Sequence, residues 1–257
     1  MELVADTLMA QDVVKPTLAW AVFFASVYFT SRLVSPALFA HVKGMNASDR
    51  SYWAASVVST VNGAITAPLA WKAALHGADV GFDVTNSWSV TACNVMLGYT
   101  TWDSMLLIWH RNEWKGLGMY FVHHFGALSS WGAGAFSGLG HNLVVPVLYL
   151  EATAPFTNLR WVLSAAGLKD TTLYIVNGFM MFLSFFILRI CFNWWLFLQR
   201  VWVQRDTFGE LPLWFRFIVL TLFPVNLMLQ MMWFQKICKG IFALLFGSGS
   251  KSSKKAK

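Results

Sequence analysis

The sequence has few charged residues and few cysteines. Of its 257 residues only 12% are charged and 57% are hydrophobic, whereas soluble domains carry about a quarter of charged residues. This shortage excludes a soluble enzyme and a disordered scaffold. Cys93, Cys191 and Cys238 lie in or beside apolar runs without CxxC spacing, so we expect space-filling side chains rather than a disulfide framework or a zinc site.

The positive charge is not gathered into one patch. The formal net charge is +7, but the basic residues lie in short connections between apolar runs and in a C-terminal cluster. A nucleic-acid-binding domain needs its Lys and Arg on one accessible face. We therefore expect no nucleic-acid partner.

Long apolar runs dominate the chain. A helix needs roughly 20 apolar residues to cross a bilayer, and the sequence divides into seven such runs. The predicted fold is therefore all-α and polytopic, with about seven transmembrane helices. Period-2 alternation is absent, which argues against a membrane β-barrel. The runs are approximately 17–40, 52–71, 88–109, 117–139, 142–166, 173–199 and 211–235.

The fifth run is the least regular. It contains Pro146, Glu151 and Pro155, and proline interrupts helical hydrogen bonding. We leave two paths open for it, a kinked crossing and a re-entrant turn.

The distribution of Lys and Arg predicts the orientation. With the N-terminus outside, thirteen of the 19 basic residues lie on the inner side, five lie outside and Arg189 lies within a span. The C-terminus is then cytosolic. The acidic start lacks the positive region of a cleaved signal peptide, so the first run is predicted to be a retained anchor. The inner residues are Arg32, Lys43, Arg50, Arg111, Lys115, Arg160, Lys169, Lys236, Lys239, Lys251, Lys254, Lys255 and Lys257.

The C-terminal segment ends in Lys254-Lys255-Ala256-Lys257. A dilysine at this position resembles the cytosolic retrieval signal of endoplasmic reticulum membrane proteins, which is an address read by a receptor. We predict Lys254 and Lys255 as a sorting signal and the endoplasmic reticulum membrane as the location. The alternative is a solvated basic tail that touches anionic lipid.

Ionisable residues inside the spans are the candidate functional residues, since such groups are costly in a bilayer. They are Asp103, the pair His123 and His124, Glu151 and Arg189. At a rise of ~1.5 Å per residue, Asp103 and the histidines lie at a similar depth of roughly 9 Å from the cytosolic face. Asp103, the histidine pair and Glu151 are predicted to converge on one cytosol-facing cavity.

Two neighbouring features receive structural interpretations. Arg189 is predicted to snorkel to the luminal interface. Gly126, Ser130 and Gly134 belong to a stripe of small residues, which favours close helix packing on the face that also carries His123.

Metal and retinal chemistry are not expected. The remaining histidines form no HxxxH or HxxHH box, and all eleven lysines lie outside the spans. A neutral imidazole can instead serve as a general base, a nucleophile or part of a polar network with Asp103.

Five segments resemble the TLC family of membrane proteins, which includes ceramide synthases and translocating-chain-associating proteins. The resemblance covers about residues 47–236 and looks most like the TLC domain-containing protein 4 subgroup. It divides the chain into an N-terminal part with the first anchor helix (1–46), a TLC domain (47–236) and a basic cytosolic tail (237–257). The segments are Trp53 to Asn62, Gly98-Tyr99 with Asp103, Gly118 to His124, Glu151 with the run Thr153 to Trp161, and Leu173 to Gly178.

The resemblance implies a six-helix TLC-type barrel and a role in lipid chemistry. It implies His123 and His124 as acyl-transfer residues, with Asp103 and Glu151 as polar partners. If the protein is an enzyme, acyl-CoA is the co-substrate, and no other cofactor is expected. Tyr99, Asn62, Asn158 and Asn177 are predicted to contact lipid.

Two departures from the ceramide synthases keep the function open. Their His-Asp-Xaa-Xaa-Asp run is missing, with only Glu151 in that region, and Asn62 stands where many relatives carry histidine. Three functions therefore remain: lipid binding or membrane lipid homeostasis, acyl-CoA-dependent transfer to a lipid amine or hydroxyl, and an accessory subunit or adaptor with protein partners in the membrane.

Overall fold

The described part of the chain is entirely helical. The computed structural model describes the backbone of residues 2–246 and the side-chain surroundings of residues 12–242, and these residues contain no strand. This confirms the predicted all-α class. The elements are α1 (Glu2–Leu38), α2 (Ala40–Lys43), α3 (Ala47–Leu75), α4 (Ser87–Trp109), α5 (Gly118–Ser137), α6 (His141–Val147), the 3₁₀ turn η1 (Leu148–Thr153), α7 (Ala154–Ala165), α8 (Thr172–Ser184), the π-helical segments η2 (Phe185–Phe192) and η3 (Leu198–Val203) on either side of α9 (Asn193–Phe197), α10 (Arg205–Gly209) and α11 (Leu213–Phe246).

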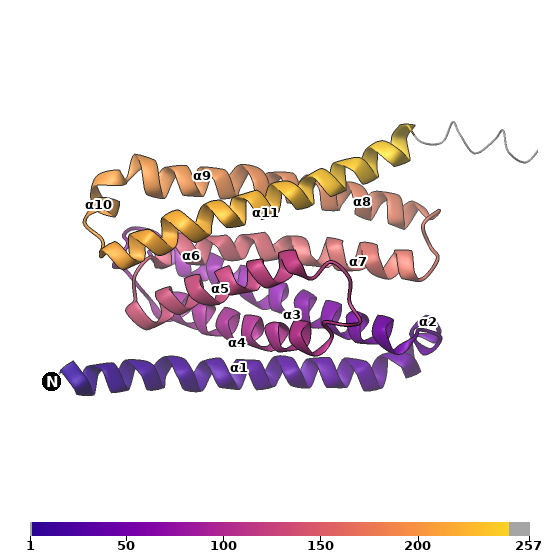
Figure 1. Cartoon of the computed structure of the whole chain (residues 1–257), viewed down its shortest axis with the longest axis horizontal. Coiled ribbons are helices and arrows are strands. Elements are labelled where there is room, and N and C mark those ends of the chain that lie inside the picture. Colours follow the sequence, from indigo (N-terminus) through magenta and orange to yellow (C-terminus); the bar gives the residue numbers. More distant parts are fainter. Residues whose placement is uncertain (1, 247–257) are drawn as a thin grey trace, which may run out of the picture.

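These elements form seven long rods that run back and forth along one direction. Figure 1 shows α1 along one side of the bundle and the α8 to α9 path with α11 along the opposite side, with α3, α4, α5 and the α6 to α7 path between them. Each rod coincides with one predicted apolar run. The α4–α5 loop, the start of α3 and the later part of α11 lie toward one end, which is the end predicted to face the cytosol.

Three helical stretches are long and apolar enough to cross a membrane, within the residues that the structure describes. They are Asp12–Leu38, Thr172–Val203 and Leu213–Phe242. The other four predicted spans coincide with helical rods outside this set. α4, for example, buries Ser89, Asn94 and Thr100, and such polar side chains lower the mean hydropathy of a helix.

Short polar side chains begin several rods. Asn46 accepts a hydrogen bond from the Asp49 backbone N–H at the start of α3, and Thr171 accepts one from Tyr174 at the start of α8. Asn86 and Ser89 form a reciprocal capping box at α4. Because the first N–H groups of a helix lack internal partners, these side chains fix where the rods start.

The fifth run follows the kinked path. The 3₁₀ turn η1 separates α6 from α7, with Pro146 just before it and Pro155 at the start of α7. The path continues toward the other end of the bundle without turning back (Figure 1). Glu151 therefore lies on irregular backbone in the middle of a rod.

The first helix, α1, packs closely against the rest of the bundle. Phe24 and Tyr28 are fully buried, and Gly98 of α4 faces the α1 backbone. A Cβ at Gly98 would lie 2.5 Å from Trp20 Cβ and 2.7 Å from the Thr17 carbonyl oxygen. The missing side chain lets the two helices approach, as small residues do in membrane bundles.

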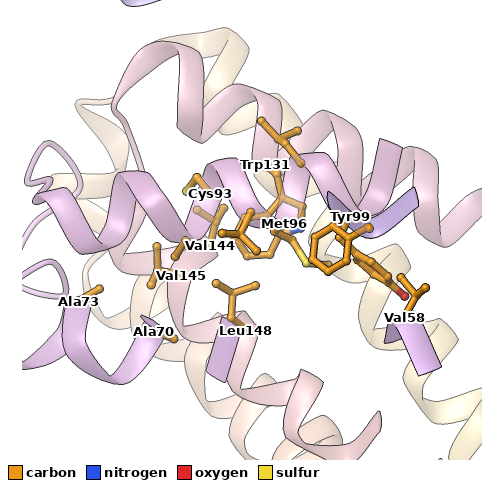
Figure 2. Packing of buried hydrophobic residues seen from close by; sticks show 14 of the residues in the cluster. Val58, Ala70, Ala73, Cys93, Met96, Tyr99, Trp131, Val144, Val145 and Leu148 are labelled. Carbon is orange, nitrogen blue, oxygen red and sulfur yellow. The ribbon is translucent and has the colours of Figure 1, made fainter. Parts of the chain in front are cut away.

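The main core lies between α1, α3, α4, α5 and the fifth rod. Figure 2 shows Met96 surrounded by Trp131, Val144 and Leu148, with Cys93 one turn away. Cys93 is fully buried here, as expected for a filler, whereas Cys191 is exposed. A second cluster with Leu143, Phe215 and Leu227 among its members joins α6, α9 and α11 toward the other end.

The predicted sorting signal Lys254 and Lys255 lies outside the described residues. The signal stays a prediction, and so do the domain limits at residues 46 and 236.

Candidate functional site

A large cavity occupies the interior of the bundle. Its volume is about 760 Å³, and α3, α4, α5, η1, α7, α8, η2 and α11 all contribute lining residues. No lining residue comes from residues 12–38, the part of α1 whose side-chain surroundings the structure describes. The exposed residues Asp49, Glu113, Lys115 and Lys236 line one end. The cavity therefore reaches the molecular surface at the α4–α5 loop.

His124 of α5 and Asp103 of α4 form a short pair in the cavity wall. His124 Nε2 lies 2.7 Å from Asp103 Oδ2, and His124 Nδ1 donates to the Tyr120 carbonyl at 2.8 Å. The two side chains are only 10% and 14% exposed. Because a carbonyl can only accept, Nδ1 carries a proton, and Nε2 shares a second proton with the carboxyl group. Both nitrogens of His124 are thus occupied.

His123 lies beside this pair with a free ring. Its ring meets the Trp233 ring edge-on at 5.4 Å between centroids and the His124 ring at 5.6 Å. Among the described residues neither ring nitrogen has a hydrogen-bond partner. His123 also lines the cavity, so it is the imidazole that can accept a proton from a bound molecule.

A second polar cluster surrounds Arg189 of η2. Its Nε donates to Thr153 Oγ1 at 2.7 Å, one terminal nitrogen donates to Gln230 Oε1 at 3.3 Å, and the other lies 3.4 Å from Glu151 Oε1. The Arg189 and Glu151 side chains are 11% and 14% exposed. The predicted snorkelling of Arg189 to the luminal interface is wrong, because the guanidinium turns into the bundle toward Glu151.

A glycine places Glu151. A Cβ at Gly63 of α3 would lie 2.6 Å from the Glu151 carbonyl oxygen. Glycine therefore allows the η1 backbone to approach α3 closely, and this approach sets the position of the carboxylate.

A smaller, mainly apolar pocket of about 90 Å³ shares part of the cavity wall. Its lining includes Val122, Gly126, Ser130, Val144 and Val219. A Cβ at Gly126 would meet no atom within 4 Å. The predicted tight packing of the small-residue stripe is wrong at this position, since Gly126 borders open space instead of a neighbouring helix.

The structure places the four predicted lipid-contacting residues in two groups. Tyr99 and Asn158 line the large cavity, and the Asn158 amide also donates to the Ser56 carbonyl at 3.0 Å and to Thr60 Oγ1 at 2.9 Å. Asn62 is fully buried against Met96, and Asn177 donates to the Phe156 carbonyl at 2.9 Å. Neither Asn62 nor Asn177 is among the lining residues.

Sequence reasoning brought Asp103, the histidines and Glu151 to one region, and the structure places all of them on the cavity wall. Their chemical roles stay predictions. The sequence-based prediction did not include Tyr52, Tyr120 and Trp233, which line the large cavity, or Gln230, which accepts a hydrogen bond from Arg189. Aromatic residues occur throughout this chain, so only the polar Gln230 within an apolar run offered a signal.

Within the described part of the chain, no group of three or more His, Cys, Asp or Glu side chains is placed to hold a metal ion. The site contains two acid–base pairs, His124–Asp103 and Arg189–Glu151, and the imidazole of His123.

The family of the chain follows from comparison with known proteins. The model of the TLC domain matches residues 52–239, which is most of the chain. The chain belongs to the TLC-domain family. The matched region contains all the residues that line the large cavity except Ser48 and Asp49.

Curated relatives agree with this assignment. TLC domain-containing protein 4 A of Dictyostelium discoideum is 24% identical over 232 residues, covering 84% of this chain and 86% of the relative. TLC domain-containing protein 4-B of Xenopus laevis is 31% identical over 174 residues, covering 62% of each chain. Both names confirm the predicted resemblance to the TLC domain-containing protein 4 subgroup.

A further relative is Topoisomerase I damage affected protein 4 of Saccharomyces cerevisiae, 26% identical over 171 residues and 60% of this chain. The match spans 56% of that relative's length. No solved structure matches the chain significantly.

Proposed function

We propose that this TLC-domain protein binds an acyl lipid in the cavity between α3 and α11 and acts in membrane lipid homeostasis. The observation that carries the proposal is the cavity of about 760 Å³ inside an apolar helical bundle. A pocket that combines apolar walls with a few convergent polar groups is typical of a small-molecule site. Asp103, His124, Glu151 and Arg189 supply those groups.

The wider setting belongs to the same proposal. It comprises seven membrane crossings, a six-helix barrel of α3 to α11 and an endoplasmic reticulum location with a cytosolic C-terminus. The lining residues favour the barrel, because all rods from α3 onward contribute to them. Under this topology, the exposed mouth with Lys115 and Lys236 faces the cytosol.

Lipid extraction tests the binding proposal. Full-length protein purified in detergent should retain an acyl lipid that mass spectrometry detects in near-stoichiometric amount. Ala127 lines both cavities, so Ala127→Trp should obstruct the place where they meet and reduce the retained lipid severalfold. Gly132 of the same helix, where a Cβ meets nothing and which lines neither cavity, provides the matched control Gly132→Trp.

Wild-type protein that retains no lipid would contradict the binding proposal and favour the adaptor function. Equal lipid in the two tryptophan variants would show that bound lipid lies on the outer surface.

A second candidate function is acyl transfer, favoured by the free ring of His123 beside the His124–Asp103 pair. In this reaction a lipid hydroxyl or amine attacks the thioester carbonyl of acyl-CoA, and His123 accepts its proton. A C–O or C–N bond forms, the C–S bond breaks, and the proton passes to the departing thiolate. Asp103 and His124 would orient the neighbouring imidazole.

Turnover of acyl-CoA with amine and alcohol acceptors tests this function. His123→Ala should abolish turnover without unfolding the protein. An unchanged cellular lipid profile in the His123→Ala and His124→Ala double variant would exclude the catalytic function.

A further inference from the structure

The large cavity and the small pocket meet at one place in the bundle. Both linings contain Met96, His123, Ala127, Glu151 and Arg189. From this junction the large cavity runs to the exposed α4–α5 loop. The small pocket runs the other way, toward residues of the second core cluster. A molecule that occupies both spaces must pass the Glu151–Arg189 pair.

Arg189 keeps hydrogen-bonding capacity at this junction. Its guanidinium carries five N–H donors, and its bonds to Thr153, Gln230 and Glu151 use three of them. Two donors therefore have no partner among the described residues. The 3.4 Å approach to Glu151 is long for a charge-assisted bond, which is usually about 2.7–2.9 Å. The guanidinium can accept a further oxygen ligand.

The surrounding side chains hold the guanidinium toward the cavities. Gln230 is 1% exposed, and its amide donates to Asn226 Oδ1 at 3.0 Å, which aims its oxygen at Arg189. Thr153 is fully buried and fixes Nε. Arg189 is thus oriented by groups on η1 and α11, and the residue lines both cavities.

The small pocket fits a hydrocarbon chain. Its walls carry side chains such as Val122, Trp131, Val144 and Val219, and its volume is about 90 Å³. The polar groups of its lining are His123 and Ser130 on α5 and a cluster of Glu151, Asn226 and Gln230 around Arg189. Apolar walls behind a cationic head site complement a ligand with one apolar chain and one electron-rich oxygen.

Gly126 leaves room in the wall of the pocket. A Cβ there meets no atom within 4 Å, whereas a Cβ at Gly134 would lie 3.2 Å from Val144 Cγ2. A larger side chain at Gly126 would therefore extend into the pocket without pressing on a neighbouring helix.

We propose that Arg189 binds the carbonyl-derived oxygen of a single-chain acyl lipid whose hydrocarbon tail lies in the pocket beside Gly126. Arg189 then selects the head group, and the absence of a side chain at Gly126 leaves the pocket open to the tail. The inference rests on the proposed function and adds to it an orientation, a head-group site and a residue that keeps the tail pocket open. The same oxygen chemistry is offered by a free carboxylate and by an ester carbonyl.

Binding of defined acyl lipids tests this arrangement. Full-length protein in detergent is titrated with decanoic, myristic, palmitic and stearic acids, and with monopalmitoylglycerol as the uncharged ester. Gly126→Leu should weaken binding of all four acids about tenfold, because Gly126 lies only three residues from His123 at the junction and the leucine takes the place of about two methylenes of every tail. Gly132→Leu on the same helix should bind the whole series like wild type.

The head-group arm uses Arg189→Gln and Arg189→Lys. The glutamine variant should bind palmitic acid at least tenfold more weakly, and the lysine variant should recover part of that affinity because it restores the cation. A similar loss for monopalmitoylglycerol identifies an ester ligand, and a loss confined to the acid identifies a carboxylate. Since Arg189→Gln leaves Glu151 without its cation, the double variant Glu151→Gln with Arg189→Gln repeats the measurement without a buried unpaired charge.

The outcomes separate the two proposals. Wild-type protein that binds none of these lipids overturns both the proposed function and this inference. Wild-type protein that binds them, with Gly126→Leu and Arg189→Gln giving unchanged affinities, overturns the inference alone.

Discussion

Two acid–base pairs of similar low exposure line the same cavity, and they differ in backbone structure, in the distance between the partners and in unused hydrogen-bonding capacity. His124 and Asp103 come from the regular helices α5 and α4 and approach to 2.7 Å. Arg189 and Glu151 come from π-helical and 3₁₀ segments and approach to 3.4 Å. The first pair uses both nitrogens of its base, whereas the second has donors to spare.

The bases also differ in chemistry. An imidazole can lose its proton and become neutral, while a guanidinium stays charged in proteins. The His124–Asp103 pair can thus lose its carboxylate without leaving a buried charge, and the Arg189–Glu151 pair cannot. In this protein the regular helices α4 and α5 hold a pair whose base has no unused nitrogen. The interrupted helices hold a permanent cation that remains available to a ligand. π-Helical segments in general occur often at functional sites.

The largest expected effect on stability comes from removing the carboxylate of the Arg189–Glu151 pair. Glu151→Ala leaves the Arg189 cation buried without its counter-ion and should lower the free energy of unfolding by about 3–5 kcal/mol. Denaturant unfolding in detergent measures the loss. Palmitic acid should restore part of the stability, because its carboxylate can replace Glu151 beside the guanidinium.

If Glu151→Ala unfolds like wild type, the junction is hydrated and the Arg189–Glu151 pair is not a buried ion pair.

Removing the carboxylate of the His124–Asp103 pair should lower the free energy of unfolding by less. Asp103→Ala leaves His124 neutral with one nitrogen unpaired, which corresponds to about 1–3 kcal/mol. The same unfolding assay applies, and palmitic acid should give no selective rescue here. A loss larger than that of Glu151→Ala would reverse the comparison between the two pairs.

A smaller effect is expected from the glycine that positions Glu151. Gly63→Ala would place a Cβ 2.6 Å from the Glu151 carbonyl oxygen. Overpacking costs about 1–3 kcal/mol, and the better helix propensity of alanine returns about 1 kcal/mol. We expect a net loss of ~1 kcal/mol in the free energy of unfolding together with weaker palmitic acid binding, since η1 must move. As a control, Gly132→Ala should keep wild-type binding of palmitic acid. Wild-type binding in Gly63→Ala would show that the position of η1 does not affect the head-group site.

A comparably small effect on stability should come from the free imidazole of His123. His123 has only ring contacts with Trp233 and His124, so His123→Ala should lower the free energy of unfolding by about 0.5–1.5 kcal/mol. If the protein transfers acyl groups, the same variant should lose turnover completely. Retained turnover in His123→Ala would move the acid–base role to the His124–Asp103 pair.

Much of the architecture was predictable from local patterns. The apolar runs coincide with the seven rods, because helix formation in such runs depends on residues near one another in sequence. The convergence of Asp103 with the histidines followed from helix length alone, since both sites lie a similar number of residues from the α4–α5 loop. The irregularity at Glu151 was signalled by its two flanking prolines.

The site around Arg189 was not predictable in this way. The snorkelling prediction rests on a regular helix that carries Arg189 toward the luminal interface. In the structure Arg189 lies on the π-helical segment η2, and η1 places Glu151 3.4 Å from its guanidinium. The small-residue stripe was misread for a similar reason: glycine permits close packing, and whether a neighbour fills the space depends on distant helices.

The sequence by itself therefore determined the helical class, the family and the polar residues that meet inside the bundle, because periodicity, composition and motifs are properties of neighbouring residues. Tertiary structure alone decided which ring is free, which cation remains open to a ligand and which face of α5 borders a pocket. These properties depend on distances between helices that are far apart in the chain, and side-chain packing sets those distances.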